Sequence, residues 1–336
     1  MPSDGVGHSL HRLRYLSLFS GVGGLDLGFG AAGWDCDGMV EIDWWCQGVL
    51  RRAWPSVHVH DDVSSFDAGL VGRVDAIVGG FPCQDVSIAG KRKGVVDGSR
   101  SGLWWEFFRI IEVVRPRAVL VENVEGLLSS NSGRDMGLII DSLVEVGYGL
   151  AWRVLDAQHF GLPQRRRRVF LCAFDRGHSG ARRASEVLGI TQHGGFGIGQ
   201  DHAQEQVGEL AGMGRPRRTG RSSCGSGIKE VVGALTKCMV GAGGGPDDNA
   251  AQAGHLVVVD GVLRRITPVE CERLMGWPDG HTSMTDDFRV VPDSRRYAMC
   301  GNGVAAPVAE WVANRMAVVL EAMDADIRLS RSLLAP

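Results

Sequence analysis

The sequence predicts an α/β protein built on a doubly wound, mostly parallel sheet, with a smaller loop-rich lobe. Short apolar runs suited to buried strands alternate with segments of helical apolar spacing through the first half of the chain. Two of these runs end in glycine- or proline-containing turns, where open α/β sheets place their ligands. Residues 194–254 then carry 16 glycines in 61 positions, which predicts a lobe without a conventional core.

The expected elements follow in order along the chain. The first strand runs through a glycine-rich turn into a helix, and later helices stop at Pro55 and before Pro116. After the glycine-rich lobe, Thr267, Pro268 and Glu270 form a helix start with a capping pattern. The expected strands are 14–19, 38–41, 57–60, 75–78, 117–121, 150–155, 169–174 and 256–259, and the helices include 44–54, 103–114, 135–146, 267–275 and 306 to about 323.

The composition narrows the class of protein. A chain of 336 residues with 44% hydrophobic and 22% charged content suits a soluble globular protein with one large core. Residues 1–13 lack an apolar signal region, and no run approaches the roughly 18 apolar residues of a membrane span. Eight cysteines without C-x-x-C pairing argue against a zinc site and a disulfide framework, so we expect a reducing, cytoplasmic compartment and no metal.

The net charge of −3 conceals an uneven distribution of basic residues. Arginine and lysine gather in short runs, which favours one positive face for nucleic acid, with solvated basic loops as the alternative. These runs are residues 91–93, 165–168, 215–221, 264–265 and 295–296.

A glycine-rich turn at residues 20–24, with Glu41 about twenty residues further on, is typical of a pocket for an adenosine-containing cofactor. Its spacing is G-x-G-G rather than G-x-G-x-x-G, which disfavours a pyrophosphate and favours S-adenosylmethionine. Phe19 is expected to stack on the adenine, unless it packs in the core, and Asp62 to accept from the adenine amine.

Candidate reacting groups gather at the same edge of the predicted sheet. Pro82 holds Cys83 on a stiff turn at the end of one strand, although this pattern taken alone favours a buried structural cysteine. Glu122 ends the neighbouring strand, where it is either a functional acid or a capping or ion-paired loop residue. Alternation before the last strand places Arg166 and Arg168 on one face and Arg165 and Arg167 on the other, unless the run is an exposed turn.

These motifs, in this order, closely resemble the DNA (cytosine-5)-methyltransferase family of prokaryotic or phage type, as found in restriction–modification systems. The resemblance extends from residue 16 to about residue 316. Its signatures here are Phe19-Ser20-Gly21-x-Gly23-Gly24, Gly80-Phe81-Pro82-Cys83-Gln84, Glu122-Asn123-Val124, Gln164-x-Arg166-x-Arg168, residues 265–276 (RITPVECERLMG), and Arg296-Tyr297 with Gly301-Asn302-Gly303-Val304.

The resemblance implies a covalent mechanism on a cytosine flipped out of duplex DNA. Cys83 would add to C6 and so activate C5, which takes the methyl group of S-adenosylmethionine and leaves S-adenosyl-L-homocysteine. Glu122 would donate to N3, and Arg168, together with Arg166, would hold the base through O2. The glycines at 79 and 80 would leave room for the flipped base.

The resemblance also implies two sets of binding residues. Double-stranded DNA would be contacted by a basic loop over residues 84–102 and by the glycine-rich lobe. The expected cofactor pocket comprises Phe19, Ser20, Gly21, Gly23, Gly24, Leu25, Glu41, Ile42, Asp62, Val63, Pro82, Leu103 and Asn302. The expected DNA contacts are Gln84, Ser87, Lys91, Arg92, Lys93, Arg215, Arg217, Arg218 and Arg221.

We therefore expect a discontinuous catalytic domain (14–175 plus 285–330), a target-recognition domain (176–284) and a flexible N-terminus (1–13). The enzyme is expected to be monomeric, with a cognate endonuclease left open and no stable complex with one. Two residues depart from the family pattern: Val86, usually aromatic, and Gly303, usually serine or alanine. A non-catalytic DNA-binding relative and an RNA cytosine-5 methyltransferase are the alternatives.

Overall fold

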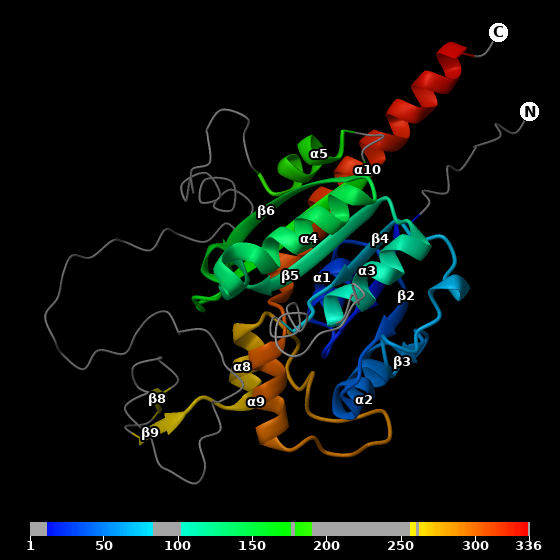
Figure 1. The fold of residues 1–336 in the computed structure, drawn as a ribbon. Coiled ribbons are helices and arrows are strands. Elements are labelled where there is room, and N and C mark those ends of the chain that lie inside the picture. Colours follow the sequence, from blue (N-terminus) through cyan, green and yellow to red (C-terminus); the bar gives the residue numbers. More distant parts are fainter. Residues whose placement is uncertain (1–11, 83–101, 176–178, 190–255, 260–261, 335–336) are drawn as a thin grey trace, which may run out of the picture.

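The computed structural model describes residues 12–82, 102–175, 179–189, 256–259 and 262–334 (Figure 1). Its main sheet has seven strands in the order β3-β2-β1-β4-β5-β7-β6. β1 to β5 pair in parallel, whereas β7 runs antiparallel to both β5 and β6. The expected doubly wound, mostly parallel sheet is confirmed.

The element boundaries lie within a few residues of most of the expected ones. The sequence analysis had no counterpart for β9 and α5. The strands are β1 Arg14–Leu18, β2 Asp35–Val40, β3 Val59–His60, β4 Ala76–Gly79, β5 Ala118–Val124, β6 Tyr148–Asp156, β7 Arg167–Asp175, β8 Leu256–Val259 and β9 Val262–Arg265. The helices are α1 Gly24–Ala31, α2 Trp44–Ala53, α3 Leu103–Val114, α4 Arg134–Glu145, α5 Gly180–Val187, α8 Pro268–Leu274, α9 Asp293–Asn302 and α10 Ala306–Leu334.

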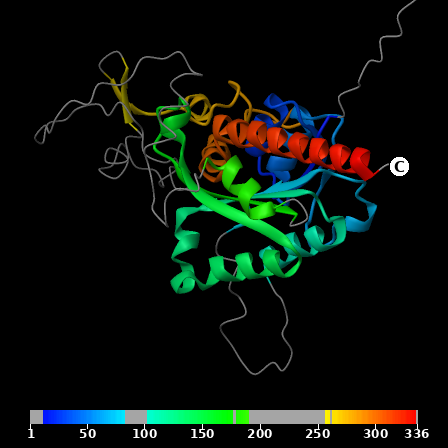
Figure 2. The same ribbon diagram turned by 90° about the horizontal axis from the view of Figure 1, so that it is seen from above.

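Helices cover both faces of the sheet (Figure 2). α1, α5 and α10 share one hydrophobic cluster, and α3 and α4 share the other. In α3 the apolar residues recur at helical spacing, and Trp104, Phe107, Phe108 and Ile111 are fully buried. Each such side chain contributes about 1.5–3 kcal/mol by leaving water, so this face holds α3 against the sheet.

β6 and β7 explain the antiparallel end of the sheet. The connection between them is the loop over residues 157–166, which includes a 3₁₀ helix at Ala157–Phe160 and no crossover helix. A parallel pair needs a crossover of about a dozen residues or more, so these strands pair as a hairpin. β7 therefore begins at the edge where β1, β4 and β5 end.

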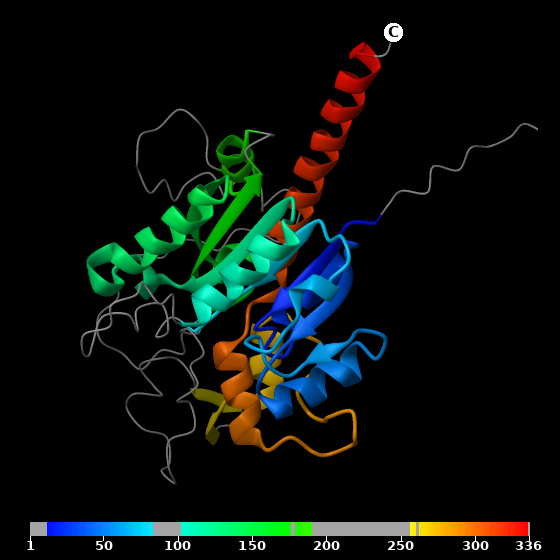
Figure 3. The ribbon, with the colours of Figure 1, turned by 45° about the vertical axis from the view of Figure 1, so that its right-hand side comes forward.

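The C-terminal segment returns to that edge of the sheet. α8 and α9 lie together at the end where α2 lies (Figures 1 and 3). The capping pattern at the start of α8 is confirmed: Thr267 Oγ1 accepts from Glu270 N–H at 3.3 Å, and the Glu270 carboxylate accepts from Thr267 N–H at 2.6 Å. Ile266, Met275 and Trp277 are buried in the same cluster as α1 and α10.

Helix α10 is longer than expected: it continues past Met323 to Leu334 and extends beyond the sheet (Figure 1). The apolar periodicity does stop near Met323, but ion pairs extend the contacts by about one turn. Arg117 holds Asp324 at 2.7 Å, and Arg183 holds Asp326 at 3.0 Å. No helix in the described ranges is long and apolar enough to cross a membrane.

Candidate active site

Four segments meet at one edge of the sheet. β1, β4 and β5 are neighbouring parallel strands, so the residues that follow them lie side by side. Because β7 is antiparallel, Arg168 at its start pairs with Val124 at the end of β5. The cofactor turn, the Pro82 turn, Glu122 and Arg168 are thus brought together, as the sequence predicted.

Glu122 is a buried acid at this edge. Its Oε1 lies 3.3 Å from Arg168 Nε and has no hydrogen-bond partner among the described residues. Burial raises the pKa of the Glu122 carboxyl, although the positive charges of Arg168 and Arg166 act in the opposite direction. The carboxyl therefore keeps its proton to a higher pH than an exposed glutamate does, which suits a proton donor.

Protein atoms fill the space beside the two glycines at the end of β4, Gly79 and Gly80. A Cβ on Gly80 would lie 2.8 Å from Glu122 Oε2, and one on Gly79 would overlap the Leu18 carbonyl. The expectation that they leave room for a flipped base is therefore wrong, because Glu122 and the backbone of Leu18 occupy that space.

Asn123 fixes the start of the turn that leads to Cys83. Its Nδ2 donates to the Phe81 carbonyl at 2.9 Å, and its Oδ1 accepts from Val124 N–H at 2.8 Å. The Phe81 ring is buried against Trp104, with centroids 5.4 Å apart. Cys83 and Val86 lie outside the described residues, as do the expected DNA contacts Gln84, Ser87, Lys91, Arg92, Lys93, Arg215, Arg217, Arg218 and Arg221.

The expected alternation of the arginines is confirmed. Arg166 and Arg168 both act on Glu122, whereas Arg167 pairs with Glu125 at 2.8 Å and Arg165 is exposed. Arg166 is buried, and burial is the main cause that lowers its pKa to about 9.

Arg166 also joins the catalytic edge to the end of α9. Its Nη2 donates to the carbonyls of Gly301, at 2.9 Å, and of Gly303. These two residues flank Asn302, an exposed residue that we expected in the cofactor pocket. Arg166 was expected beside the base, and no pattern in the sequence indicates its contact with the end of α9.

The glycine-rich turn between β1 and α1 is anchored by Glu41. Gly21 has a positive φ of 57° and donates its N–H to Glu41 Oε2 at 2.7 Å. Glu41 Oε1 accepts from Asp43 N–H at 2.9 Å. The half-buried Phe19 ring stacks on Phe107 with centroids 6.2 Å apart, so it packs on the core through one face.

The other expected cofactor residues are placed as follows. Ile42 is 75% exposed beside the half-buried Glu41, an arrangement that fits an adenine base above a ribose. Open space surrounds Gly21, where no atom lies within 4 Å of a built Cβ. Ser20, Leu25 and Val63 are buried, Leu103 is half-buried, Pro82 is exposed, and Asp62 accepts from Ser64 N–H at 2.8 Å.

Two residues of the C-terminal segment that the sequence did not single out lie at this turn: His281 bonds to it, and the Trp277 ring packs close to Gly24 at its end. Nε2 of the buried His281 lies 2.7 Å from the Val22 carbonyl, and Trp277 Nε1 donates to the Val304 carbonyl at 3.0 Å. A Cβ on Gly303 would lie 2.5 Å from the Trp277 ring, so glycine is required there. The family pattern has serine or alanine at position 303, and the large Trp277 ring explains why this chain has glycine there. Trp277 is the residue in the sequence that indicates this need.

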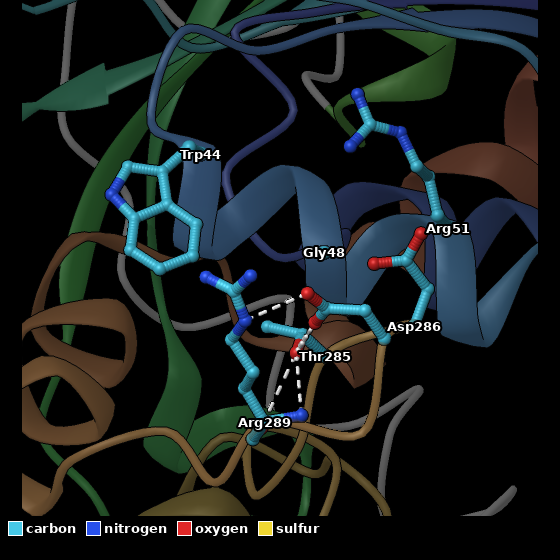
Figure 4. Close-up of a pocket in the computed structure, with 7 residues that line it drawn as sticks. Trp44, Gly48, Arg51, Thr285, Asp286 and Arg289 are labelled. Atoms are coloured by element: carbon cyan, nitrogen blue, oxygen red, sulfur yellow. Dashed lines mark hydrogen bonds and ion pairs between the residues drawn. The ribbon is translucent and has the colours of Figure 1, made fainter.

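A separate cavity of about 200 Å³ lies between α2 and the loop at 285–289 (Figure 4). Arg289 pairs with Asp287 at 2.7 Å and lies over the Trp44 ring at 5.8 Å. No candidate reacting residue lines it. Its lining residues are Trp44, Gly48, Arg51, Thr285, Asp286, Asp287 and Arg289.

The sheet, with its glycine-rich turn and adjacent acid at the carboxyl ends of the strands, defines a Rossmann-like α/β fold. The family model described as C-5 cytosine-specific DNA methylase matches residues 13–186 and 188–317. The chain belongs to this family, and it is a DNA cytosine-5 methyltransferase.

Curated relatives match nearly the whole chain. The type II methyltransferase M2.BsuMI of Bacillus subtilis (strain 168) is 30% identical over 90% of this chain and 75% of its own length. M.NlaX of Neisseria lactamica is 29% identical over 92% of this chain and 98% of its own length.

Solved structures share the fold. The Dnmt2 methyltransferase of S. pombe matches with a TM-score of 0.62 at 18% identity, over 93% of this chain and 99% of its own. A putative DNA modification methyltransferase encoded within an E. coli prophage matches with a TM-score of 0.59 at 23% identity, over 92% and 99%.

Proposed function

We propose that this enzyme methylates C5 of one cytosine within a specific duplex DNA sequence, as a type II restriction–modification methyltransferase does. We propose Cys83 as the nucleophile, Glu122 as the proton donor to N3, and Arg168 as the residue that holds the base. The observation that supports this assignment best is the buried Glu122 carboxyl, with its raised pKa, 3.3 Å from Arg168 and beside the turn that leads to Cys83.

The residue types explain how C5 becomes reactive. As the Cys83 sulfur bonds to C6, the electron pair of the C5–C6 double bond becomes available at C5 and the ring gains electron density at N3. The proton of Glu122 neutralises that charge, and the Arg168 guanidinium balances the charge at O2. S-adenosylmethionine supplies an electrophilic methyl group when bound. Loss of the C5 proton to a base then breaks the S–C6 bond and frees Cys83.

The cofactor site proposed here is the G-x-G-G turn with Glu41, Ile42 and Asn302. Glu41 accepts from two backbone amides, and a carboxylate has about four acceptor positions, so it can still accept from two ribose hydroxyls. The exposed Ile42 side chain offers the adenine an apolar surface.

The packing suggests narrower limits for the recognition domain than the sequence did. α5 packs on β6, β7 and α10, and residues 266–277 contribute to the core under α1. We propose that the catalytic domain includes residues 14–189 and 264–334, and that the segment between them reads duplex DNA. We further propose that the enzyme acts as a monomer in the cytoplasm of a bacterium, where the gene is resident or phage-borne.

Covalent trapping tests the mechanism. Duplex DNA that contains 5-fluorocytosine in place of cytosine, incubated with the full chain and S-adenosylmethionine, should give a denaturation-resistant complex that Cys83→Ala abolishes. Cys36→Ala, which changes a half-buried thiol on β2, is the matched control and should still be trapped.

Bisulfite sequencing of a co-expressed plasmid should show one methylated sequence. An absence of both trapping and plasmid methylation would overturn the DNA assignment. Methyl transfer to RNA but not to duplex DNA would establish the RNA alternative.

A further inference from the structure

A buried chain of hydroxyl groups lies beneath the cofactor turn and ends on Asp26 of α1. Ser20 Oγ donates to Ser17 Oγ at 2.9 Å, Ser17 Oγ donates to Asp26 Oδ2 at 3.2 Å, and Tyr15 Oη donates to Asp26 Oδ1 at 3.2 Å. All four side chains are buried, and Asp26 is completely so. The side-chain hydrogen bonds therefore converge on one carboxylate.

The direction of this chain requires an acceptor at its end. Ser20 Oγ lies 2.9 Å from Ser17 Oγ and 3.2 Å from the Ser17 carbonyl, so its single hydrogen serves either acceptor of Ser17, and Ser17 Oγ gives its own hydrogen to Asp26. Tyr15 approaches the other carboxylate oxygen as a second donor. Asp26 accepts from both hydroxyl groups at once when it is ionised, whereas a protonated carboxyl would have to turn its own hydrogen towards one of them.

An ionised carboxylate is costly at this position. It accepts from Ser17, Tyr15 and its own backbone amide, and no ion pair to it occurs within the described ranges. Burial consequently raises the pKa of Asp26 to about 6. A neutral side chain of the same shape would cost the folded state less free energy. The presence of an acid is therefore explained by the hydroxyl groups of Ser17 and Tyr15 that its carboxylate holds in place.

The turn above Asp26 is fixed at three consecutive residues. Ser20 is held through Ser17 and by its N–H bond to the Val40 carbonyl at 3.1 Å. Gly21 is held by Glu41 at 2.7 Å, and Val22 by His281 at 2.7 Å. Of these bonds, the one from Ser20 Oγ to Ser17 Oγ is linked to Asp26, and it approaches from below the turn.

We propose that Asp26 is a positioning residue for S-adenosylmethionine, and that its carboxylate holds the turn at residues 19–23, through Ser17 and Ser20, in the conformation that receives the cofactor. The inference rests on the cofactor site proposed above. Asp26 is buried beneath the turn and acts on the cofactor only through Ser17 and Ser20. Its replacement therefore weakens cofactor binding indirectly and leaves the DNA-binding surface unchanged.

Asp26 is also the group in this cluster that changes charge near neutral pH. Tyr15 on β1 and Cys36 on β2 face it, and burial raises the pKa of both well above their usual values, so both remain neutral. α10 meets α1 at Gly28 through Ala306, Ala309 and the backbone nitrogen of Glu310, the one residue of the three with a titratable side chain. Protonation of Asp26 removes one acceptor, so cofactor affinity should fall as the pH drops through about 6.

Calorimetric titration of the full chain with S-adenosyl-L-homocysteine tests the proposal. Asp26→Asn and, independently, Ser17→Ala should each raise the Kd about tenfold at pH 7.5, the effect of losing about 1.4 kcal/mol of binding free energy. The matched control is Asp35→Asn, an exposed acid at the start of β2 that pairs with Arg12, and it should leave the Kd unchanged. The Kd for duplex DNA without cofactor should be unaffected in all three variants.

The pH dependence separates positioning from a general loss of structure. The wild-type Kd should rise between pH 7.5 and 5.5, whereas the Kd of Asp26→Asn should stay nearly constant over that range. Wild-type affinity in both Asp26→Asn and Ser17→Ala would overturn the role of Asp26 and leave the cofactor site intact. Failure of the wild type to bind S-adenosyl-L-homocysteine would overturn both proposals. Should Asp26→Asn fail to fold, Ser17→Ala alone decides.

Discussion

The carboxylate of Glu122 occupies the space that a side chain at Gly80 would need. Glu122 Oε2 lies 2.8 Å from a Cβ built on Gly80, and the Glu122 carbonyl oxygen lies 3.2 Å from it. β4 and β5 are neighbouring strands, so this glycine lets the acid at the end of one strand lie across the turn at the end of the other. Gly80 thus sets the distance between Glu122 and the segment that carries Cys83.

Gly80→Ala should displace Glu122 and lower kcat. A shift of about 1 Å in a reacting group can cost about a hundredfold in rate, so we expect a loss of about ten- to a hundredfold. The Kd for S-adenosyl-L-homocysteine should stay unchanged, because Glu41 holds the cofactor turn separately. Methyl transfer at saturating DNA and cofactor is the measurement.

Gly137→Ala is the matched control for this variant. Gly137 lies in α4, and no atom lies within 4 Å of a Cβ built there. We expect full turnover and a gain in stability of about 0.5–1 kcal/mol. Wild-type kcat in Gly80→Ala would show that the glycine does not position Glu122.

Glu122→Gln should lose most turnover while it retains DNA binding, because the amide has the shape of the carboxyl but no acidic proton to give. The stability of Glu122→Gln, unlike its turnover, should not fall below that of the wild type at high pH. Burial raises the folded-state pKa of Glu122 above its unfolded value, so the stability associated with the neutral acid is full below the unfolded pKa and is lost as the pH rises through the folded pKa.

A glutamine avoids that loss at every pH. The Tm of Glu122→Gln should therefore equal or exceed that of the wild type at pH 8, and the difference should shrink towards pH 4. Calorimetry across this range measures it, with Glu125→Gln, the exposed partner of Arg167, as control. A variant that is less stable at pH 8, or one with full turnover, would contradict this account of Glu122.

Gly303→Ala should destabilise the fold through Trp277. The added methyl group would lie 2.5 Å from the Trp277 ring, and overpacking of this kind costs about 1–3 kcal/mol. Trp277→Phe removes the outer ring atoms at that contact, so Gly303→Ala should cost less in that background. Urea denaturation of the four proteins of the cycle measures the coupling, and additive effects would show that the two residues do not restrict each other.

The sequence predicted this site as far as local patterns determine it. Apolar runs and turn residues located the strands, and strand adjacency then brought Glu122 to the sheet edge beside the cofactor turn. A glycine in a sequence, however, does not say what fills its space: Gly80 accommodates Glu122, where we expected a flipped base.

Contacts between distant segments were also out of reach. Arg166 and Gly301, His281 and Val22, and Asp324 and Arg117 are each joined across more than a hundred residues, with no periodicity to mark them. The last of these pairs extends the contacts of α10 past Met323. The family motifs identified Arg166 as a site residue without revealing what it binds.

Arg166→Lys should separate the roles of the two site arginines. Arg166 Nη2 reaches two backbone carbonyls, those of Gly301 and Gly303, and a lysine has neither the guanidinium fork nor its planar geometry. Because Asn302 lies between these glycines, we expect cofactor binding to weaken by about 1.5–3 kcal/mol, the usual range for hydrogen bonds to a charged group. Arg168 contacts the Glu122 carboxylate directly and has no bond to the end of α9 among the described residues, so Arg168→Lys should lower the single-turnover rate at saturating cofactor and leave the Kd for S-adenosyl-L-homocysteine unchanged. Calorimetry and single-turnover methyl transfer on both variants give the comparison. The same pattern of losses in the two variants would mean that both arginines serve the base, and that the bonds from Arg166 to the end of α9 do not shape the cofactor pocket.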